Sequence, residues 1–138
     1  MSWRLGRAVE VRYLLDTHAF LWWLTDDPKL SSVAREVISD ESKVILVSAA
    51  SAWEIATKYR LGKLPIGEGA VARFNELVKA DGFEHLPVTY LHALKAGTYE
   101  VDHRDPFDRM LAAQSALELA PLISCDPVFS AFGTQLVW

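Results

Sequence analysis

The sequence is poor in cysteine, because Cys125 is the only one among 138 residues and no internal disulfide bond can form. Chains without disulfide bonds are typical of reducing compartments, so we expect a cytoplasmic protein. Residues 1–12 lack the apolar core that a secretory signal peptide needs. No uninterrupted apolar run approaches the ~20 residues of a membrane-spanning helix, and we predict no membrane association.

The chain also lacks an excess of basic residues. Its 14 Lys and Arg are outnumbered by 18 Asp and Glu, and a net charge of −4 is not typical of a general nucleic-acid binder. With 51% hydrophobic residues, a chain of this length can build one domain with a substantial core. We assign residues 11–138 to this domain and residues 1–10, which show no clear periodicity, to an N-terminal extension.

Short apolar runs alternate with amphipathic segments along the domain. We predict strands at residues 11–15, 43–47, 83–88, 121–125 and 135–138, with the third at a sheet edge because it contains Pro87. We predict helices at residues 19–24, 30–38, 48–58, 71–78, 89–97 and 106–117. Because the strands are apolar on both faces, the pattern predicts a three-layer α/β/α domain with a mainly parallel central sheet.

Four acidic residues stand where strands end or helices begin, namely Asp16, Glu54, Asp108 and Asp126. Ligands of parallel sheets sit outside the carboxyl ends of the strands, so these acids are expected at one edge. Two carboxylates ~4 Å apart repel by ~4 kcal/mol at a protein-like dielectric constant, and a cluster of them therefore favours a cation. Ligands that are all oxygens indicate Mg²⁺ or Mn²⁺, and such a cation activates water for phosphodiester hydrolysis.

Each acid also has a purely structural interpretation. An acid at the start of a helix caps it or favours its dipole, and a Ser-x-x-Glu spacing predicts a capping box. These alternatives are caps or dipole contacts by Asp105, Asp108 and Asp126, a turn at Asp16, a capping box of Ser51 with Glu54, and an ion pair of Glu54 with Lys58. Capping does not require all the acids at one edge of one sheet, and the shared position favours a metal site.

Four ordered segments carry these acids, at residues 13–22, 48–64, 105–114 and 122–126. Together they resemble the motifs of PIN-domain ribonucleases, and most closely the VapC-type toxins of bacterial and archaeal toxin–antitoxin pairs. The resemblance implies that Asp16, Glu54, Asp108 and Asp126 are catalytic residues and metal ligands, with Asp105 as an auxiliary ligand. It also implies a Mg²⁺- or Mn²⁺-dependent endoribonuclease, a homodimer, and an antitoxin protein that blocks the site.

Several residues beside the acids are expected to contact the RNA substrate, because basic side chains hold phosphates and small hydroxyl residues match the family pattern. The predicted contacts are Thr17, Lys58, Arg104, Arg109 and Ser124. His18 replaces the asparagine of many family members, and we expect it to form hydrogen bonds near the site. Trp22, Trp23 and Trp53 could stack on bases, but packing in the core or a dimer interface is favoured. We assign no role to His85, His92 and His103.

Two classes of function remain. The first is a metal-dependent endoribonuclease that acts as a toxin, and retention of all four acids favours it. The second is a PIN-like fold without turnover that serves as an RNA- or protein-binding regulatory module. A nuclease for structured DNA is disfavoured, because the chain has no obvious insertion that would grip a duplex. For the homodimer, we expect the apolar segment 20–24 or the helix at 71–78 in the interface.

Overall fold

Five parallel strands form the central sheet of the computed structural model, which describes residues 10–64 and 67–138. Of the predicted N-terminal extension, only Glu10 lies within the described residues. The strand order is β3-β2-β1-β4-β5, and every neighbouring pair is parallel. The strands are β1 (Arg12–Leu15), β2 (Val44–Ser48), β3 (Glu84–Leu86), β4 (Leu122–Ile123) and β5 (Leu136–Val137). The predicted parallel sheet is confirmed, and β3, which precedes Pro87, lies at an edge.

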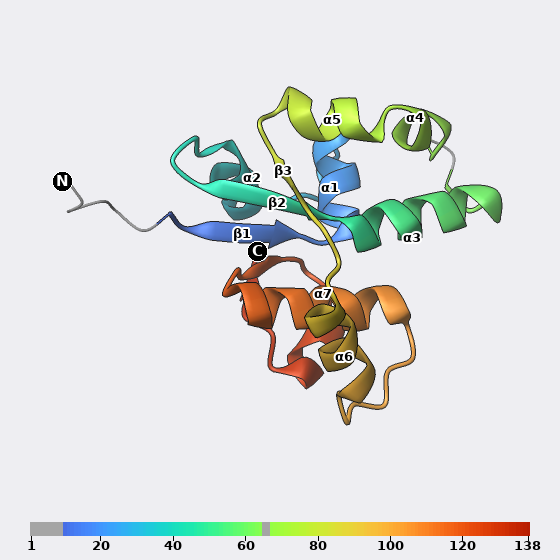
Figure 1. The fold of residues 1–138 in the computed structure, drawn as a ribbon. Helices are drawn as coiled ribbons and strands as arrows, with labels where there is room; N and C mark the ends of the chain where they lie inside the picture. The colour runs from blue at the N-terminus through green and yellow to red at the C-terminus, as the bar shows by residue number, and fades with distance from the viewer. Residues whose placement is uncertain (1–9, 65–66) are drawn as a thin grey trace.

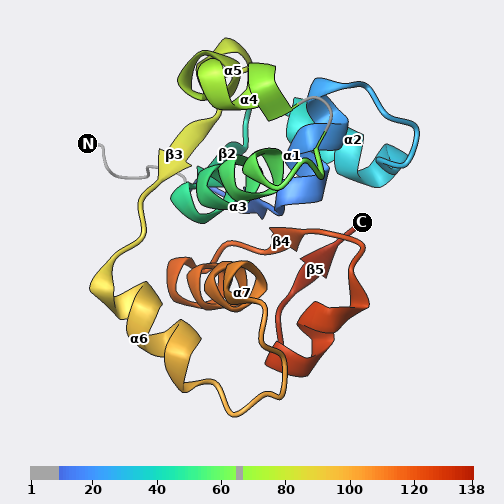
Figure 2. The same ribbon diagram turned by 90° about the vertical axis from the view of Figure 1, so that its right-hand side faces the viewer.

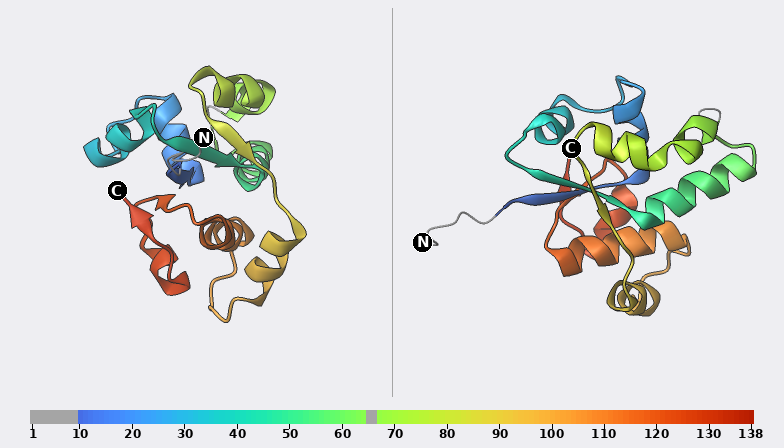
Figure 3. Two further views of the ribbon diagram at one scale, coloured as in Figure 1. Left: turned by 60° about the vertical axis from the view of Figure 1, so that its left-hand side comes forward. Right: turned by 45° about the horizontal axis from the view of Figure 1, so that its top comes forward.

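Helices cover both faces of the sheet and complete the predicted three-layer α/β/α architecture (Figures 1 and 2). One face carries α1 (Thr17–Leu24), α2 (Ser32–Ser39), α3 (Ala49–Arg60), α4 (Gly67–Ala72) and α5 (Phe74–Ala80). The opposite face carries α6 (Tyr90–Thr98), α7 (Pro106–Glu118) and the 3₁₀ helix η1 (Pro127–Phe132). The left view of Figure 3 shows the α4–α5 pair and the α6–α7 pair on opposite sides of the strands. None of the described helices is long and apolar enough to cross a membrane.

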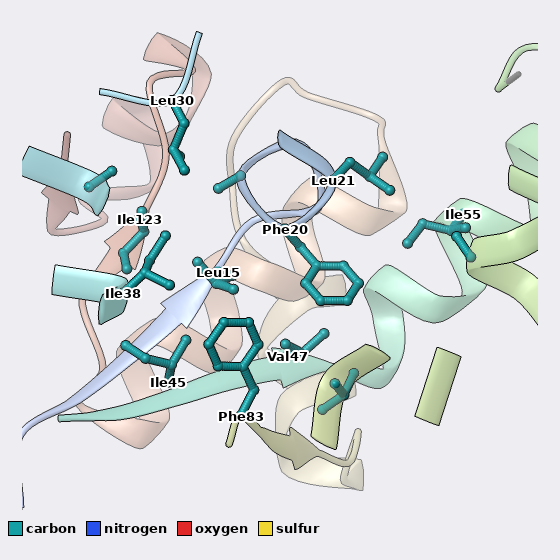
Figure 4. Packing of buried hydrophobic residues seen from close by; sticks show 14 residues of the cluster. Leu15, Phe20, Leu21, Leu30, Ile38, Ile45, Val47, Ile55, Phe83 and Ile123 are labelled. Atoms are coloured by element: carbon teal, nitrogen blue, oxygen red, sulfur yellow. The ribbon is translucent and has the colours of Figure 1, made fainter. Parts of the chain in front are cut away.

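Alternate residues of the strands supply two separate cores. Leu15, Val47 and Ile123 face α1, α2 and α5, and Figure 4 shows Leu15 and Val47 beside the rings of Phe20 and Phe83. The residues one position earlier in each strand face α7 and η1, where the cluster consists of Leu14, Leu46, Leu122, Leu111 and Phe129. A slip of one residue would exchange these faces. Since full burial of each such side chain is worth about 1.5–3 kcal/mol, the two cores fix the register of the strands.

Three local predictions were wrong. The segment 71–78 is not one helix, because helical structure is interrupted at Arg73, between α4 and α5. The two ends of the segment differ in burial, since Val78 is fully buried whereas Val71 is 41% exposed. The fourth strand is shorter than predicted, because β4 spans only Leu122–Ile123, although the N–H of Ser124 still donates to the carbonyl of Val137 in β5 at 3.2 Å. Leu117, an apolar residue at the end of the helix predicted at 106–117, is 45% exposed instead of buried.

The segment 20–24 is largely used within the chain itself. Phe20 and Leu21 are buried in the core, and the ring of Trp23 packs on Phe83 while its indole N–H donates to the Asp81 carboxylate at 3.0 Å. Trp22, Trp23 and Leu24 are partly buried. The homodimer, with this segment or residues 71–78 in its interface, stays a prediction.

Candidate active site

The carboxyl ends of β1 and β2 lie side by side at one end of the sheet, and α1 and α3 begin there (Figure 1). β4 pairs parallel to β1, so its carboxyl end lies at the same end of the sheet. Asp16 follows β1 directly, and its backbone N–H donates to the carbonyl of Ile123 at 3.1 Å, which ties the end of β1 to the end of β4. Its Oδ1 accepts the N–H of Ala19 at 2.7 Å and so caps α1. Only 6% of Asp16 is exposed. Asp16 is therefore both a cap and a buried carboxylate at the edge where ligands are expected.

Glu54 lies on the inward face of α3, with 4% of its surface exposed. The N-cap of this helix is Ser48, so the predicted capping box of Ser51 with Glu54 does not form. Ser51 instead accepts a hydrogen bond from the Thr17 hydroxyl at 2.9 Å, which joins the first turns of α1 and α3. The predicted ion pair is confirmed, because the Lys58 ammonium lies 2.5 Å from Oε2 of Glu54. A buried carboxylate in the site thus already carries a cationic partner.

Asp108 lies in the first turn of α7, after the predicted N-cap and proline. The cap is confirmed, because Oδ1 of Asp105 accepts the N–H groups of Phe107 at 2.9 Å and of Asp108 at 3.2 Å. Nε2 of His103 lies 2.8 Å from Oδ2 of Asp108. The imidazole therefore fixes one carboxylate oxygen of Asp108 and leaves the other for a further partner.

Asp126 reaches the same edge from the end of β4 through Ser124. The Ser124 hydroxyl accepts the N–H of Asp126 at 3.0 Å, and it lies close enough to the Asp16 carboxylate to lower the pKa of that group. Oδ1 of Asp126 accepts the N–H of Val128 at 3.0 Å, which confirms the predicted cap, here on η1. Asp16 and Asp126 line one hollow in the surface. Ser124 is the residue that holds these two acids in position.

Glu54 interacts electrostatically with two of the other acids, Asp16 and Asp108. Burial raises the pKa of Asp16, against the lowering by its hydrogen bonds to Ser124 and to the Ala19 N–H, and the charge of Glu54 raises it further. Burial likewise raises the pKa of Asp108, where Asp105 and Glu54 add to the rise and His103 opposes it. A carboxylate whose proton affinity is increased by neighbouring negative charge also gains from a bound cation.

The acids provide the type of donor atom that a hard cation prefers, but they are not arranged as a complete set of ligands. The acids offer oxygen ligands alone, which suit Mg²⁺ or Mn²⁺. However, in residues 10–64 and 67–138 no group of three His, Cys, Asp or Glu side chains is arranged to hold a metal ion. The structure thus brings Asp16, Glu54 and Asp108 within electrostatic reach and places Asp126 beside Asp16, without converging all four on one point.

Two of the predicted substrate contacts are turned into the protein. Thr17 and Ser124 are 4% and 1% exposed, and both hydroxyls have partners among neighbouring side chains. A hydroxyl that is buried and paired cannot meet an RNA strand, so these residues position other groups of the site. Lys58 and Arg104 remain at the surface, half-buried and exposed respectively.

Arg109 also has a structural task in place of the predicted phosphate contact. Its guanidinium donates four hydrogen bonds to backbone carbonyls, those of Ala96 at 2.8 Å, Tyr99 at 2.6 Å, and Val101 and His103 at 2.9 Å each. The side chain thus fastens the end of α6 and the loop that follows it to α7. Because that loop carries His103, Arg109 also supports the partner of Asp108.

The sequence reasoning missed two polar residues of the site. His103 received no role, although a residue two positions before an N-cap lies beside the first turn of the helix, where Asp108 stands. Gln114 is fully buried, accepts the Ser48 hydroxyl at 2.5 Å and donates to the Pro87 carbonyl at 3.3 Å. A lone amide on the apolar face of α7 was the available signal, and the residue joins α7 to the start of α3.

A parallel α/β/α sheet domain with acids gathered at its carboxyl edge is the class that this geometry defines. The family model of the PIN domain matches residues 13–134, and the chain belongs to that family. It is 41% identical over 69 residues to ribonuclease VapC16 of Mycobacterium tuberculosis, a match that covers 47% of this chain and 49% of that protein. The chain therefore aligns with about half the length of this curated relative.

Among solved structures, the fold is similar to a chain in the crystal structure of VapBC2 from Rickettsia felis bound to a DNA fragment from their promoter. The TM-score is 0.65 with 16% sequence identity, over 91% of this chain and 97% of that chain. At this identity the similarity confirms the fold.

Proposed function

We propose that the chain is a Mg²⁺- or Mn²⁺-dependent endoribonuclease that acts in the cytoplasm as the toxin of a toxin–antitoxin pair. The observation that carries this proposal is the placement of three acids at the carboxyl ends of the parallel strands: Asp16 at the start of α1, Glu54 buried on α3 and Asp108 in the first turn of α7. The charge of Glu54 helps to raise the pKa of both aspartates. Membership of the PIN domain family supports it, as does similarity to a protein named as a ribonuclease.

In this proposal Asp16, Glu54, Asp108 and Asp126 are the catalytic residues and hold the cation, with Asp105 as an auxiliary ligand. The cation supplies Lewis-acid chemistry for the attack of water on an RNA phosphodiester. Carboxylate oxygens suit this ion, and its positive charge favours the ionised form of Asp16 and Asp108, whose pKa values are raised by burial and, to a smaller extent, by neighbouring negative charge.

The remaining polar groups orient the acids and bind RNA. Ser124 holds Asp16, and His103 holds one oxygen of Asp108, so each acid keeps a defined direction. Lys58 balances the charge of Glu54. We propose that Lys58 and the exposed Arg104, just before α7, also contact RNA phosphates, since positively charged side chains supply most such contacts.

The proposed antitoxin blocks this site with a side chain. The ion pair of Lys58 with Glu54 is an example of an ammonium group that neutralises one of these carboxylates. An antitoxin that presents an Arg or Lys would act in the same way, in place of the cation. The fold similarity to a chain of a VapBC2 structure supports a partner of this kind. A homodimer of the chain is part of the same proposal.

The test is cleavage of a fluorescent single-stranded RNA by the purified full chain. We expect cleavage with Mg²⁺ or Mn²⁺, none in excess EDTA, and no recovery with Zn²⁺ alone. Asp16→Asn, purified identically, should be inactive, while Asp40→Asn, which removes one exposed acid at the other end of β2, should cut as wild type does. Cleavage that persists in EDTA or in Asp16→Asn would contradict the metal mechanism.

The second candidate is the binding module without turnover. The observation that favours it is the arrangement of the acids in the described part of the chain, which is not closed around an ion. The two candidates differ in cells: a toxin slows growth of its host when expressed, and co-expression of the neighbouring antitoxin gene relieves the effect. Soluble wild-type protein that leaves growth unchanged would favour the binding module.

A further inference from the structure

A small hollow of about 270 Å³ lies directly beside two of the acids. Its walls are Asp16, His18, Trp22, Cys125, Asp126 and Pro127, so it lies between the first turns of α1 and the segment from β4 to η1. Pockets for drug-sized ligands measure ~300–1,000 Å³. The hollow is smaller than that range and suits a single flat ring system rather than a larger group.

Two aromatic rings form one wall of the hollow. His18 and Trp22 are four residues apart on α1, hence on one face of the helix, and their ring centroids lie 5.8 Å apart with planes at 41°. Trp138 packs edge-on against Trp22 at 5.8 Å, which holds the indole in place. His18 is exposed, whereas Trp22 is half-buried. The wall therefore combines one fixed ring with one accessible ring.

The charges around the hollow limit what can enter it. Asp16 and Asp126 line it and hold the proposed cation, so the wall that remains for a further group is the one formed by His18, Trp22 and Pro127. The ammonium of Lys29 lies 5.8 Å from the centroid of the Trp22 ring and supplies positive charge beside the aromatic wall. Bases of single-stranded RNA stack on aromatic side chains while lysines hold their phosphates. This arrangement of a flat apolar wall with an adjacent cation suits one nucleotide of an unpaired strand.

We propose that this hollow is a base-binding subsite, which takes one unpaired base next to the cleaved phosphodiester and stacks it on His18 and Trp22. The inference rests on the proposed ribonuclease function and adds to it a contact with one base, since a base in a continuous duplex cannot enter a hollow of this size. Nucleotide preference next to the cut then depends on His18 and Trp22.

The test measures binding and cleavage separately. Binding of a short fluorescent single-stranded RNA is followed by anisotropy with Mg²⁺ in an Asp108→Asn background, and abasic nucleotides replace the bases one at a time. At one position beside the cut, loss of the base should weaken binding about fivefold or more, as expected for base stacking on an aromatic ring. In Trp22→Leu and His18→Ala the same abasic substitution should cost less than twofold, because the shared contact is already gone.

Tyr90→Leu is the matched control. This aromatic residue is 73% exposed on α6, on the opposite face of the sheet from α1 (Figure 2), and its variant should respond to abasic nucleotides as wild type does. Since Trp22 also packs against the core, the exposed His18 provides a variant that does not threaten folding.

The outcomes separate the subsite from the nuclease. Suppose that the wild-type protein cleaves RNA and that removal of one base weakens RNA binding equally in wild type and in His18→Ala. This result overturns the subsite and leaves the proposed ribonuclease function intact. Suppose instead that the protein does not cleave RNA, and that removal of one base weakens RNA binding in wild type but not in His18→Ala. This result overturns the nuclease and supports the subsite. Loss of antitoxin binding in Trp22→Leu, with unchanged base-dependent RNA binding, overturns the subsite in favour of a protein contact.

Discussion

Arg109 gives the sharpest test of the site's framework, because the structure replaces a predicted phosphate contact with four hydrogen bonds to backbone carbonyls. Arg109→Met keeps much of the side chain's length and removes all four bonds. At about 1 kcal/mol net for each, their sum is about 4 kcal/mol. The segment around the acceptors is partly exposed, and carbonyls that regain water reduce this to about 3 kcal/mol. Arg109→Lys keeps the charge but loses the planar fork, and should cost about 2 kcal/mol.

The assay is equilibrium unfolding in urea. A domain of this size unfolds with a free energy of about 5–15 kcal/mol, so a loss of about 3 kcal/mol is large enough to measure. With an m-value of about 2 kcal/mol/M, the midpoint of Arg109→Met should fall by about 1.5 M. Arg104→Met is the matched control, since this exposed arginine lies five positions earlier, and it should change stability by no more than about 0.5 kcal/mol.

Two results would refute this reasoning. An unfolding free energy of Arg109→Met within about 1 kcal/mol of wild type would show that the four bonds contribute little. A variant with unchanged stability but a weaker salt dependence of RNA binding would restore the phosphate contact that the sequence predicted.

The remaining predictions concern the acids. In EDTA, Asp16→Asn should raise the melting temperature, by about 3–6 °C if relief of repulsion is worth about 1–2 kcal/mol, since asparagine keeps the helix cap; a lower melting temperature would contradict shared strain. Mg²⁺ should stabilise wild type but neither Asp16→Asn nor Asp108→Asn, and an equal Mg²⁺ response in melts of all three would count against a common metal site. Burial raises the pKa of Asp16 above its ordinary 3.8, so the folded state binds this proton more tightly and the advantage of Asp16→Asn should shrink as the pH falls toward 3.8, which melts across a pH series will show. Hydrogen bonds from His92 and Arg12 lower the pKa of Glu118 below its ordinary 4.5, so Glu118→Gln should cost up to about 1 kcal/mol of unfolding free energy at neutral pH. That cost should begin to shrink as the pH falls through 4.5 and disappear once the pH is below the lowered pKa of Glu118 in the folded state. Urea titrations that show the same cost at neutral and at acidic pH would exclude the linkage.

Sequence reasoning was sufficient to predict the parallel sheet and to place the site at the carboxyl ends of its strands. Apolar runs on both faces indicate buried parallel strands, and parallel strands bring their carboxyl ends, with Asp16 and Asp126, to one side. Interactions between residues close in sequence were also predictable, since the cap by Asp105 and the ion pair of Glu54 with Lys58 depend only on spacing along one helix. Such features follow from neighbours in sequence, and no long-range contact is needed to predict them.

Which polar side chains face the site and which support it depends on packing between elements that are distant in the chain. Thr17 and Ser124 match the family pattern, yet packing against other elements turns both inward. Arg109 and His103 acquire their tasks because the loop after α6 folds back onto α7. The direction of a side chain depends on what a distant segment packs against it, and that information lies in contacts between residues far apart in the chain. Spacing along the chain placed the acids, and packing across it assigned their partners.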